Sequence, residues 1–314
     1  MSQALDVHDL CKSYTNAGRG HNKRVRYAEA EEDVEARSAE HADFHLSSVS
    51  LTLPTGYIMG FVGQNGAGKT TTIRCILNMA RRESGEIKIF GADNIADELE
   101  IKQELGTVFD EIFFVSSWRV QEVEKALHGF YKDWNTALYH DFLKEFDLPP
   151  DKKVDELSRG MKMKLMLAVA MSHGAKLLIL DEPTSGLDPV AREELLDILQ
   201  DYIADGEKSV FFSTHITSDL ERIADYITVI ERGTIFYTGT KDGLLEHFSI
   251  VTGSTDDLTD SVRDKIIGLE KTRTGFTGMV QSAQVKTLPA GIAAQPPTID
   301  EILIHISKEG GRHD

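Results

Sequence analysis

The chain has few cysteines and no long apolar run, and both absences restrict what it can be. Among its 314 residues only Cys11 and Cys75 are cysteines, and their spacing matches no metal-binding or redox motif. Cys75 lies in an apolar pattern, so we expect a buried packing residue there. No apolar run approaches the ~18–20 residues that span a bilayer, and the opening MSQALDVHDL lacks the features of a signal peptide. We therefore expect a cytoplasmic protein.

Positive charge is also scarce. The chain has 34 Lys and Arg against 51 Asp and Glu, which gives a formal net charge of −17. A dedicated nucleic-acid binder usually carries a basic stripe, so we expect no nucleic-acid partner. The length suits one large domain or two modest ones, and 41% hydrophobic with 27% charged residues is ordinary for a globular protein. Composition excludes classes of protein without identifying a function.

The most informative motif is a glycine-rich loop, GQNGAGKT, at residues 63–70. It matches the pattern G-x-x-x-x-G-K-[ST] and stands between an apolar run and an apolar helical pattern. Glycines let backbone N–H groups converge on phosphates, and the following helix presents its N-terminus to the anion. We expect Lys69 to reach the β- and γ-phosphates and Thr70 to supply a hydroxyl to Mg²⁺. The predicted nucleotide contacts are Gln64, Asn65, Gly66, Ala67, Gly68, Lys69, Thr70 and Thr71.

A second constellation is the apolar strand LLILDEP at residues 177–183, which ends in two carboxylates. Ligands bind at the carboxyl ends of strands in open α/β sheets. We expect Asp181 to hold Mg²⁺ through a bound water and Glu182 to polarise the attacking water as general base. Asp-Glu is a common strand end, so the assignment depends on its pairing with the glycine loop.

Three further motifs surround this strand in a fixed order. ELSRGMKMKL (156–165) precedes it, TSGLDP (184–189) follows it, and STH (213–215) ends the next strand. In order and spacing, the chain from Leu5 to about Gly239 resembles the ATP-binding subunits of ABC transporters, most of all those of bacterial exporters with a separate permease. That resemblance implies ATP and Mg²⁺ as cofactors and ATP hydrolysis coupled to transport. It also implies an integral membrane permease at the cytoplasmic face of the membrane, and head-to-tail pairing with a second copy or a related subunit around two ATP.

The resemblance assigns roles to residues in these flanking motifs. Ser158, Arg159 and Gly160 match the signature that binds the γ-phosphate held in the opposite subunit, although a serine there also suits a helix cap. Asp188 matches the loop that communicates across the dimer, although an aspartate before a proline is also a common turn residue. His215 matches the switch histidine that contacts the γ-phosphate and steadies Glu182.

The chain departs from the family pattern at three places. The signature reads Leu-Ser-Arg-Gly-Met, where most of the family has glycine third and glutamine fifth. Asp110 occupies the position of a glutamine that senses Mg²⁺ and the permease, and a carboxylate there can still ligate the metal. Tyr14 matches the adenine-stacking position, but residues 16–43 form an insertion and Tyr27 within it competes for that role.

Strands alternating with helices predict an α/β core with a largely parallel sheet. The resemblance implies a P-loop NTPase fold of the ABC type, with a mixed sheet core, an antiparallel β-subdomain and a helical subdomain at about 95–155. We expect an ATPase domain over 1–240 and a small C-terminal module over 241–314, which either regulates dimer closure or caps the fold. Residues 4–14 indicate an edge strand and residues 44–56 a strand pair.

Aromatic residues and methionines of the helical region are expected to be mostly core, and the remainder to line a groove for a short permease helix. The residues concerned are Phe113, Phe114, Trp118, Phe130, Tyr131, Trp134, Met161, Met163, Met166 and Met171.

Two other functions compete with transport. A soluble ABC-type ATPase acting on ribosomes or nucleic acid remains the alternative, but such translation proteins usually carry two cassettes, and this chain has one. Repair relatives insert a long coiled coil where only about 90 residues separate Lys69 from Ser158. A metabolic P-loop kinase would leave Ser158, Asp188 and His215 unexplained.

Overall fold

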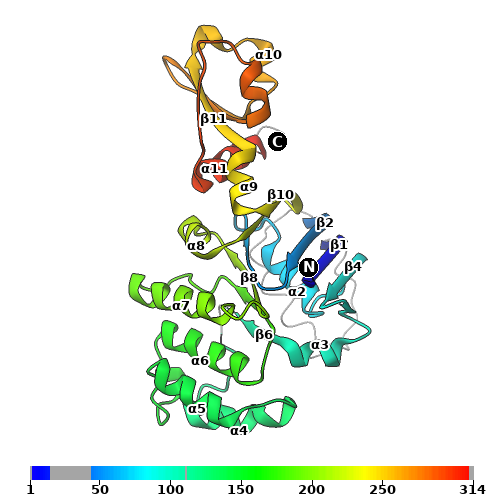
Figure 1. Ribbon diagram of the computed structural model, residues 1–314, viewed down its shortest axis with the longest axis vertical. Coiled ribbons are helices and arrows are strands. Elements are labelled where there is room, and N and C mark those ends of the chain that lie inside the picture. Colours follow the sequence, from blue (N-terminus) through cyan, green and yellow to red (C-terminus); the bar gives the residue numbers. More distant parts are fainter. Residues whose placement is uncertain (1, 15–43, 110–111, 311–314) are drawn as a thin grey trace, which may run out of the picture.

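The computed structural model describes residues 2–14, 44–109 and 112–310. The described residues form three sheets, of which the first lies beside the central one and the third lies at one end of the long axis (Figure 1). The first is antiparallel, in the order β2 (Phe44–Pro54), β1 (Gln3–Tyr14), β4 (Ser84–Ile89) and β5 (Ala92–Asp93). The central sheet has the order β10 (Thr234–Thr240), β9 (Tyr226–Glu231), β3 (Ile58–Val62), β8 (Ser209–Thr214), β7 (Leu177–Asp181) and β6 (Leu105–Val108). The third has the order β12 (Ile267–Lys271), β13 (Gly275–Gln281), β11 (Phe248–Ser254) and β14 (Ala293–Gln295).

The central sheet is parallel except for β10, which pairs antiparallel with β9. Every residue of β3, β7 and β8 is buried. Strands covered on both faces read as continuous apolar runs, which is the pattern of these segments. The expected α/β core is therefore confirmed.

Helix α2 (Lys69–Ile76) packs on one face of this sheet, and α6 (Arg159–Ser172), α7 (Pro189–Tyr202) and α8 (Thr217–Ile223) pack on the other. The other helices in the described residues are α3 (Glu98–Glu104), α4 (Val120–Leu127), α5 (Thr136–Glu145), α9 (Lys241–His247), α10 (Asp260–Arg263) and α11 (Ile299–Gly310). Short 3₁₀ turns occur at His128–Phe130, Val154–Glu156, Thr255–Asp257 and Ser282–Thr287. Figure 1 places α4 and α5 at one end of the molecule and the third sheet at the other.

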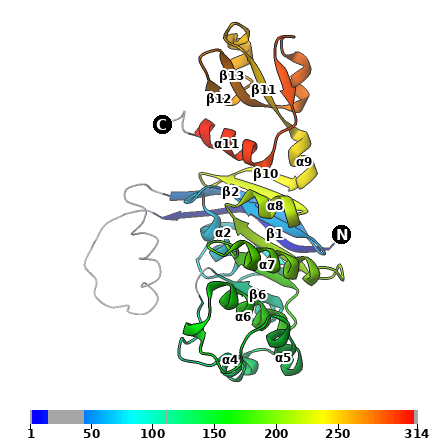
Figure 2. The ribbon, with the colours of Figure 1, turned by 90° about the vertical axis from the view of Figure 1, so that its left-hand side faces the viewer.

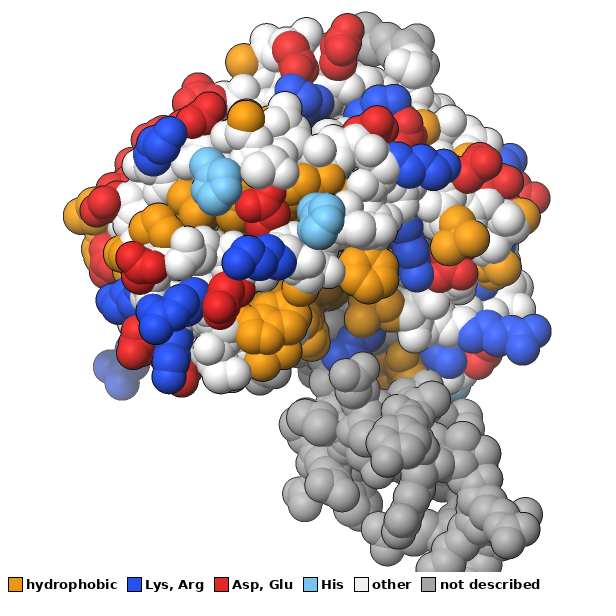
Figure 3. All heavy atoms as spheres, turned by 90° about the horizontal axis from the view of Figure 1, so that it is seen from below, with side chains coloured by type: hydrophobic (Ala, Val, Ile, Leu, Met, Phe, Trp, Pro, Cys, Tyr) orange, Lys and Arg blue, Asp and Glu red, His pale blue; other side chains and the backbone are white. Residues whose placement is uncertain are grey.

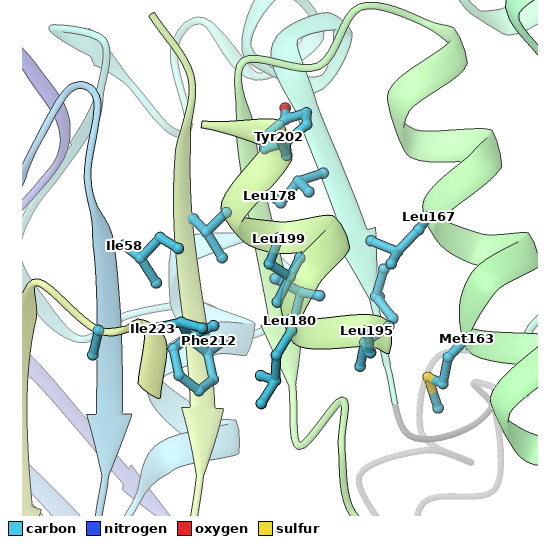
Figure 4. Packing of buried hydrophobic residues seen from close by; sticks show 14 of the residues in the cluster. Ile58, Met163, Leu167, Leu178, Leu180, Leu195, Leu199, Tyr202, Phe212 and Ile223 are labelled. Carbon is cyan, nitrogen blue, oxygen red and sulfur yellow. The ribbon is translucent and has the colours of Figure 1, made fainter. Parts of the chain in front are cut away.

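Alternate residues of the central strands enter two different cores. Ile58, Leu180 and Phe212 pack with residues of α6, α7 and α8, as Figure 4 shows. Met59 and Phe211 point to the opposite face, toward α2 and the first sheet. This alternation follows the two-residue period of a strand, and burial of each such side chain contributes about 1.5–3 kcal/mol.

The predicted burial of Cys75 and of the methionines is confirmed. Cys75 is in the core beside α2, where burial raises the pKa of its thiol to about 11. Met163 and Met166 are buried in the core beneath α6, and Met161 and Met171 pack half-buried against it.

Two expectations about the first sheet were wrong. The segment predicted as an edge strand, β1, is central, because it pairs with β2 on one side and with β4 on the other. The segment predicted as a strand pair is one long strand, β2, whose register against β1 shifts instead of breaking. Ser48 adopts a left-handed φ of 51° within it, so a local irregularity replaced the turn that the sequence suggested.

The range expected for the helical subdomain also contains a strand of the core. β6 pairs in parallel with β7 and so belongs to the central sheet. Helices α4, α5 and α6 then follow, with the 3₁₀ turn Val154–Glu156 between α5 and α6 (Figure 2). In the described residues, no helix is both long and apolar enough to cross a membrane.

Candidate functional site

The glycine-rich loop lies between β3 and the N-terminus of α2. Gly66 and Gly68 adopt left-handed φ values of 80° and 113°. A Cβ on Gly68 would stand 2.6 Å from a methyl of Leu46, so the close packing of the loop on β2 requires glycine there. Among the described residues no side chain caps α2. Its first N–H groups therefore have no side-chain acceptor, which suits a phosphate.

Lys69 is buried at the start of α2, and its ammonium points back over the loop. Nζ donates to the carbonyl oxygen of Gly63 at 2.9 Å and to that of Gln64 at 3.4 Å. It also lies 3.2 Å from Oε1 of Glu182. The other predicted contacts follow the chain around it: Gln64, Asn65 and Gly66 are exposed, Ala67, Gly68 and Thr71 are buried, and Thr70 is half-buried.

Asp181 and Glu182 stand at the carboxyl end of β7, as predicted, and Ser213 of β8 holds both. The Ser213 hydroxyl donates to Oδ1 of Asp181 at 2.5 Å and accepts from the backbone N–H of Glu182 at 2.9 Å. Glu182 has a φ of 51°, a conformation that non-glycine residues rarely adopt and that clusters at functional sites. The turn directs its carboxylate toward the glycine-rich loop, where Lys69 receives it.

His215 completes this group from the end of the neighbouring strand. Its Nδ1 lies 2.7 Å from Oε2 of Glu182, while the ring remains about half exposed. An ionised Glu182 accepts this hydrogen bond, so a neutral imidazole carries its proton on Nδ1. One carboxylate thus contacts a lysine through one oxygen and a histidine through the other.

Asp219 is a site residue that the sequence reasoning missed. It is fully buried on α8, where its carboxylate accepts from the Thr184 hydroxyl at 2.5 Å and from Nε of Arg192 at 2.5 Å. These bonds join the segment after Glu182 to the helix after His215. The signal in the sequence was a charged residue directly before the apolar Leu220, four residues beyond the histidine.

The donors present suit Mg²⁺, which takes hard oxygen ligands and keeps several waters and substrate oxygens. Thr70 offers a hydroxyl and Asp181 a carboxylate that is already oriented by Ser213. Within the described ranges no cluster of three or more His, Cys, Asp or Glu side chains could hold an ion alone. Mg²⁺ is usually held by one or two protein oxygens together with substrate phosphates, and Thr70 and Asp181 would supply the protein oxygens. Asp110 lies outside the described residues, and its role at the metal stays a prediction.

The signature and the Asp188 loop lie together on two neighbouring helix N-termini. The Ser158 hydroxyl caps α6 by accepting from the N–H of Met161, and Asp188 caps α7 through two backbone N–H groups at 3.0 Å. The Arg159 guanidinium packs on the loop before Asp188, since a Cβ on Gly186 would meet its Nη1 at 2.9 Å. Gly160 also packs closely against α7, because a Cβ added to it would stand 3.1 Å from the Cβ of Ala191. The helix-cap interpretation of Ser158 is confirmed, and its phosphate contact stays a prediction.

Tyr14, the predicted adenine contact, ends β1 opposite Phe44. It is half-buried, and Nζ of Lys12 lies 4.8 Å from its ring centroid, so one face of the ring already meets a cation. Tyr27 and the insertion at 16–43 lie outside the described residues. Adenine stacking on Tyr14 stays a prediction.

Comparison with known proteins agrees with this arrangement. A family model described as ABC transporter matches residues 46–185, and a model of an AAA domain matches residues 153–221. The chain is 33% identical over 195 residues to the bacitracin transport ATP-binding protein BcrA of Bacillus licheniformis, covering 60% of this chain and 63% of BcrA. It is 30% identical over 267 residues to Nod factor export ATP-binding protein I of Neorhizobium galegae, covering 77% of this chain and 73% of that protein.

A solved structure, described as the ATP-binding subunit of an ABC transporter, has the same fold. It matches with a TM-score of 0.63 and 26% identity, over 77% of this chain and 91% of that one. The predicted fold class and family are confirmed. Together with the site geometry, these similarities show that the chain belongs to the ATP-binding subunits of ABC transporters, which are P-loop ATPases.

Proposed function

We propose that the chain powers an exporter by closing as a dimer around two Mg-ATP and driving a separate integral membrane permease from the cytoplasmic face. The observation that carries this proposal is the position of Glu182, held between Lys69 and His215 at the carboxyl end of β7. Export is supported by the names of the relatives, which transport bacitracin and export Nod factor. The dimer partner is a second copy or a related subunit.

The three side chains suggest how ATP is split. Lys69 and the N-terminus of α2 bind the phosphates, and Mg²⁺, held by Thr70 and Asp181, would neutralise charge on them. Glu182 then acts as general base and accepts a proton from the attacking water. His215 orients that carboxylate and offers its exposed ring edge to the γ-phosphate.

The second half of each site would come from the opposite subunit. Ser158 and Asp188 are exposed, and each caps a helix whose N-terminus favours an anion. Their own helices pack side by side, so one subunit presents both motifs on the same surface. Head-to-tail pairing would place this surface over the glycine-rich loop of the partner.

An apolar surface at the end of the molecule that carries α4 and α5 supports a permease partner. Figure 3 shows hydrophobic side chains gathered on this end. Phe113, before α4, is 63% exposed, and Phe130, in the turn after α4, is 74% exposed. Phe113 packs edge-on against Phe109, with ring centroids 5.4 Å apart, directly after β6. Most of these aromatics were expected to be core, and Phe114, Trp118 and Trp134 do pack half-buried against it, whereas Phe113 and Phe130 belong to the exposed remainder. Exposed apolar side chains of this size suit a short permease helix.

The test uses Glu182→Gln as bait. This variant is expected to bind ATP and accumulate as a closed dimer, because the amide keeps the shape of the carboxylate but cannot act as a base. Detergent-solubilised host membranes would be passed over it with Mg-ATP, and retained proteins identified by mass spectrometry. The control bait is Glu182→Gln combined with Lys69→Ala, which should not close.

A polytopic membrane protein retained in near-stoichiometric amount by the first bait, and not by the control, is the expected result. Ribosomal proteins or nucleic acid retained without any permease would overturn the proposal in favour of a regulator of those processes.

A further inference from the structure

The C-terminal helix α11 contacts both loops that converge on Glu182. Gln64 in the glycine-rich loop donates through its side-chain amide to the hydroxyl of Ser307, 243 residues away in the sequence. Thr217, two residues after His215, donates through its hydroxyl to Oδ1 of Asp300 at 2.6 Å. Figure 2 shows α11 lying between the third sheet and the ATPase core.

The residues involved share one face of the helix. Positions 300, 303, 304 and 307 recur at the spacing of neighbouring turns, so they form a single stripe about 10 Å long. This stripe borders a cavity of about 300 Å³ between α11 and the nucleotide loops. Its lining includes Gly63, Gln64, His215, Leu303 and Ser307. Two turns of the helix therefore face the site, and the contact extends beyond a single residue.

A neighbouring face anchors α11 firmly. Ile299, Ile302 and Ile306 are buried in the main core, each no more than 3% exposed. His305 is buried beside β12, where its Nδ1 lies 2.8 Å from the carbonyl oxygen of Gly268. Burial of three isoleucines is worth several kcal/mol, far more than either surface hydrogen bond. The helix is thus a fixed support, and Asp300 and Ser307 on its stripe can hold the loops.

We propose that Ser307 and Asp300 are positioning residues of the ATPase, through which the C-terminal module holds the glycine-rich loop and the segment after His215 in place. Ser307 acts through Gln64 on the loop that binds phosphate. Asp300 acts through Thr217 on the first turn of α8, and so on the direction of His215. The inference rests on the ATPase function but not on the permease or on export.

The two residues predict different kinetic defects. Ser307→Ala frees the loop that binds ATP, so KM and the Kd for ATP should rise twofold to tenfold with little change in kcat, the range for one ordinary hydrogen bond. Asp300→Ala frees the segment after His215, so kcat should fall by a similar factor with little change in KM. Asp300→Asn keeps an oxygen that accepts from Thr217 and should restore kcat.

A double-mutant cycle tests whether Ser307 acts through its partner. Gln64→Ala should raise KM by itself, and adding Ser307→Ala should then cause no further rise. Glu270→Ala is the matched control, because Glu270 pairs with Lys308 on the same helix but contacts neither loop. Its KM and kcat should equal those of the original chain. Melting temperatures of all variants are measured in parallel.

The expected result is a higher KM for Ser307→Ala and a lower kcat for Asp300→Ala, with melting temperatures unchanged. Lower melting temperatures with unchanged KM and kcat would overturn the proposal and leave α11 as a cap on the fold. A higher kcat in both alanine variants would also overturn it, since α11 would then restrain the site. Steady-state ATPase assays of the purified chain need no permease, so failure to capture one in the membrane experiment would leave this result intact.

Discussion

Nδ1 of His215 lies 2.7 Å from Oε2 of Glu182, so a residue at the end of β8 fixes the carboxylate at the end of β7. This contact joins two motifs that lie 33 residues apart and belong to neighbouring strands. It predicts that the histidine affects chemistry more than binding.

His215→Ala should lower kcat for ATP hydrolysis by about 10²-fold, the loss typical of removing one preorganised electrostatic contact. The Kd for ATP should change less than about threefold, because Lys69 and α2 still bind the phosphates. Steady-state kinetics and a fluorescent-nucleotide titration measure both quantities. His8→Ala serves as control, since that ring is exposed and bonds Asp6 far from the site. An equal loss in kcat and in affinity would contradict the assigned role.

Lys69→Ala should weaken ATP binding about tenfold to a hundredfold, because it removes charge-assisted hydrogen bonds to phosphate. Equilibrium binding of a fluorescent ATP analogue gives the Kd directly. Lys102→Ala removes an exposed lysine that pairs with Glu98, and its Kd should not change. Undiminished affinity of Lys69→Ala would remove the glycine-rich loop from nucleotide binding.

Asp219→Ala should destabilise the fold by about 3 kcal/mol, because it leaves Arg192 and the Thr184 hydroxyl without a buried acceptor. Urea unfolding measures this change. Asp197→Ala removes an exposed partner of Arg222 and should cost less than about 1 kcal/mol. Equal effects of the two variants would show that the bonds of Asp219 add nothing beyond a surface pair.

His173 predicts a pH dependence of stability. Burial lowers the pKa of its imidazole. The ring stacks on that of Tyr131 with the two centroids 3.9 Å apart, and its buried Nδ1 has no hydrogen-bond partner among the described residues. A histidine pKa below its ordinary value of about 6.5 means that the unfolded chain binds the proton more readily. The stabilisation is therefore present above about pH 6.5 and is lost as the pH falls toward the lowered value.

The free energy of unfolding of His173→Gln should accordingly fall less steeply between about pH 7 and pH 5 than that of the original chain. Denaturant unfolding at several pH values measures the slope. His8→Gln, an exposed histidine, should keep the original slope. Parallel curves for the original chain and His173→Gln would rule out a contribution from this ring.

Phe113→Ser combined with Phe130→Ser should abolish capture of the membrane partner while the ATPase rate of the purified chain stays within about twofold, since exposed side chains contribute little to folding. Capture of the membrane partner is measured with the Glu182→Gln bait that also carries the two serine substitutions. The ATPase rate is measured by steady-state hydrolysis with the two serine substitutions alone, Glu182 being retained. Substituting Phe236→Ser, an exposed phenylalanine on β10 away from α4 and α5, provides an apolar control. Retention of the partner by the double variant would place the permease elsewhere.

The local motifs were predictable because each depends on neighbours in the chain. The glycine-rich loop needs a strand before it and a helix after it, and both patterns were visible around Gly68. The same holds for Glu182 at its strand end and for Ser158 and Asp188 as helix caps. Backbone N–H groups at a helix start must find an acceptor, and the residue just before the helix is the nearest one.

Contacts between distant segments were not predictable in this way. The sequence predicted the glycine-rich loop and most of the strands and helices around it, and the order of its motifs pointed to Lys69, Glu182 and His215, whose catalytic roles stay predictions. Only the tertiary structure decided that β1 is central, that Asp219 joins Thr184 to Arg192, and that α11 lies on the nucleotide loops. Residue type and period specify which face of an element is apolar, but many partners can cover such a face. The choice among them depends on packing of the whole chain.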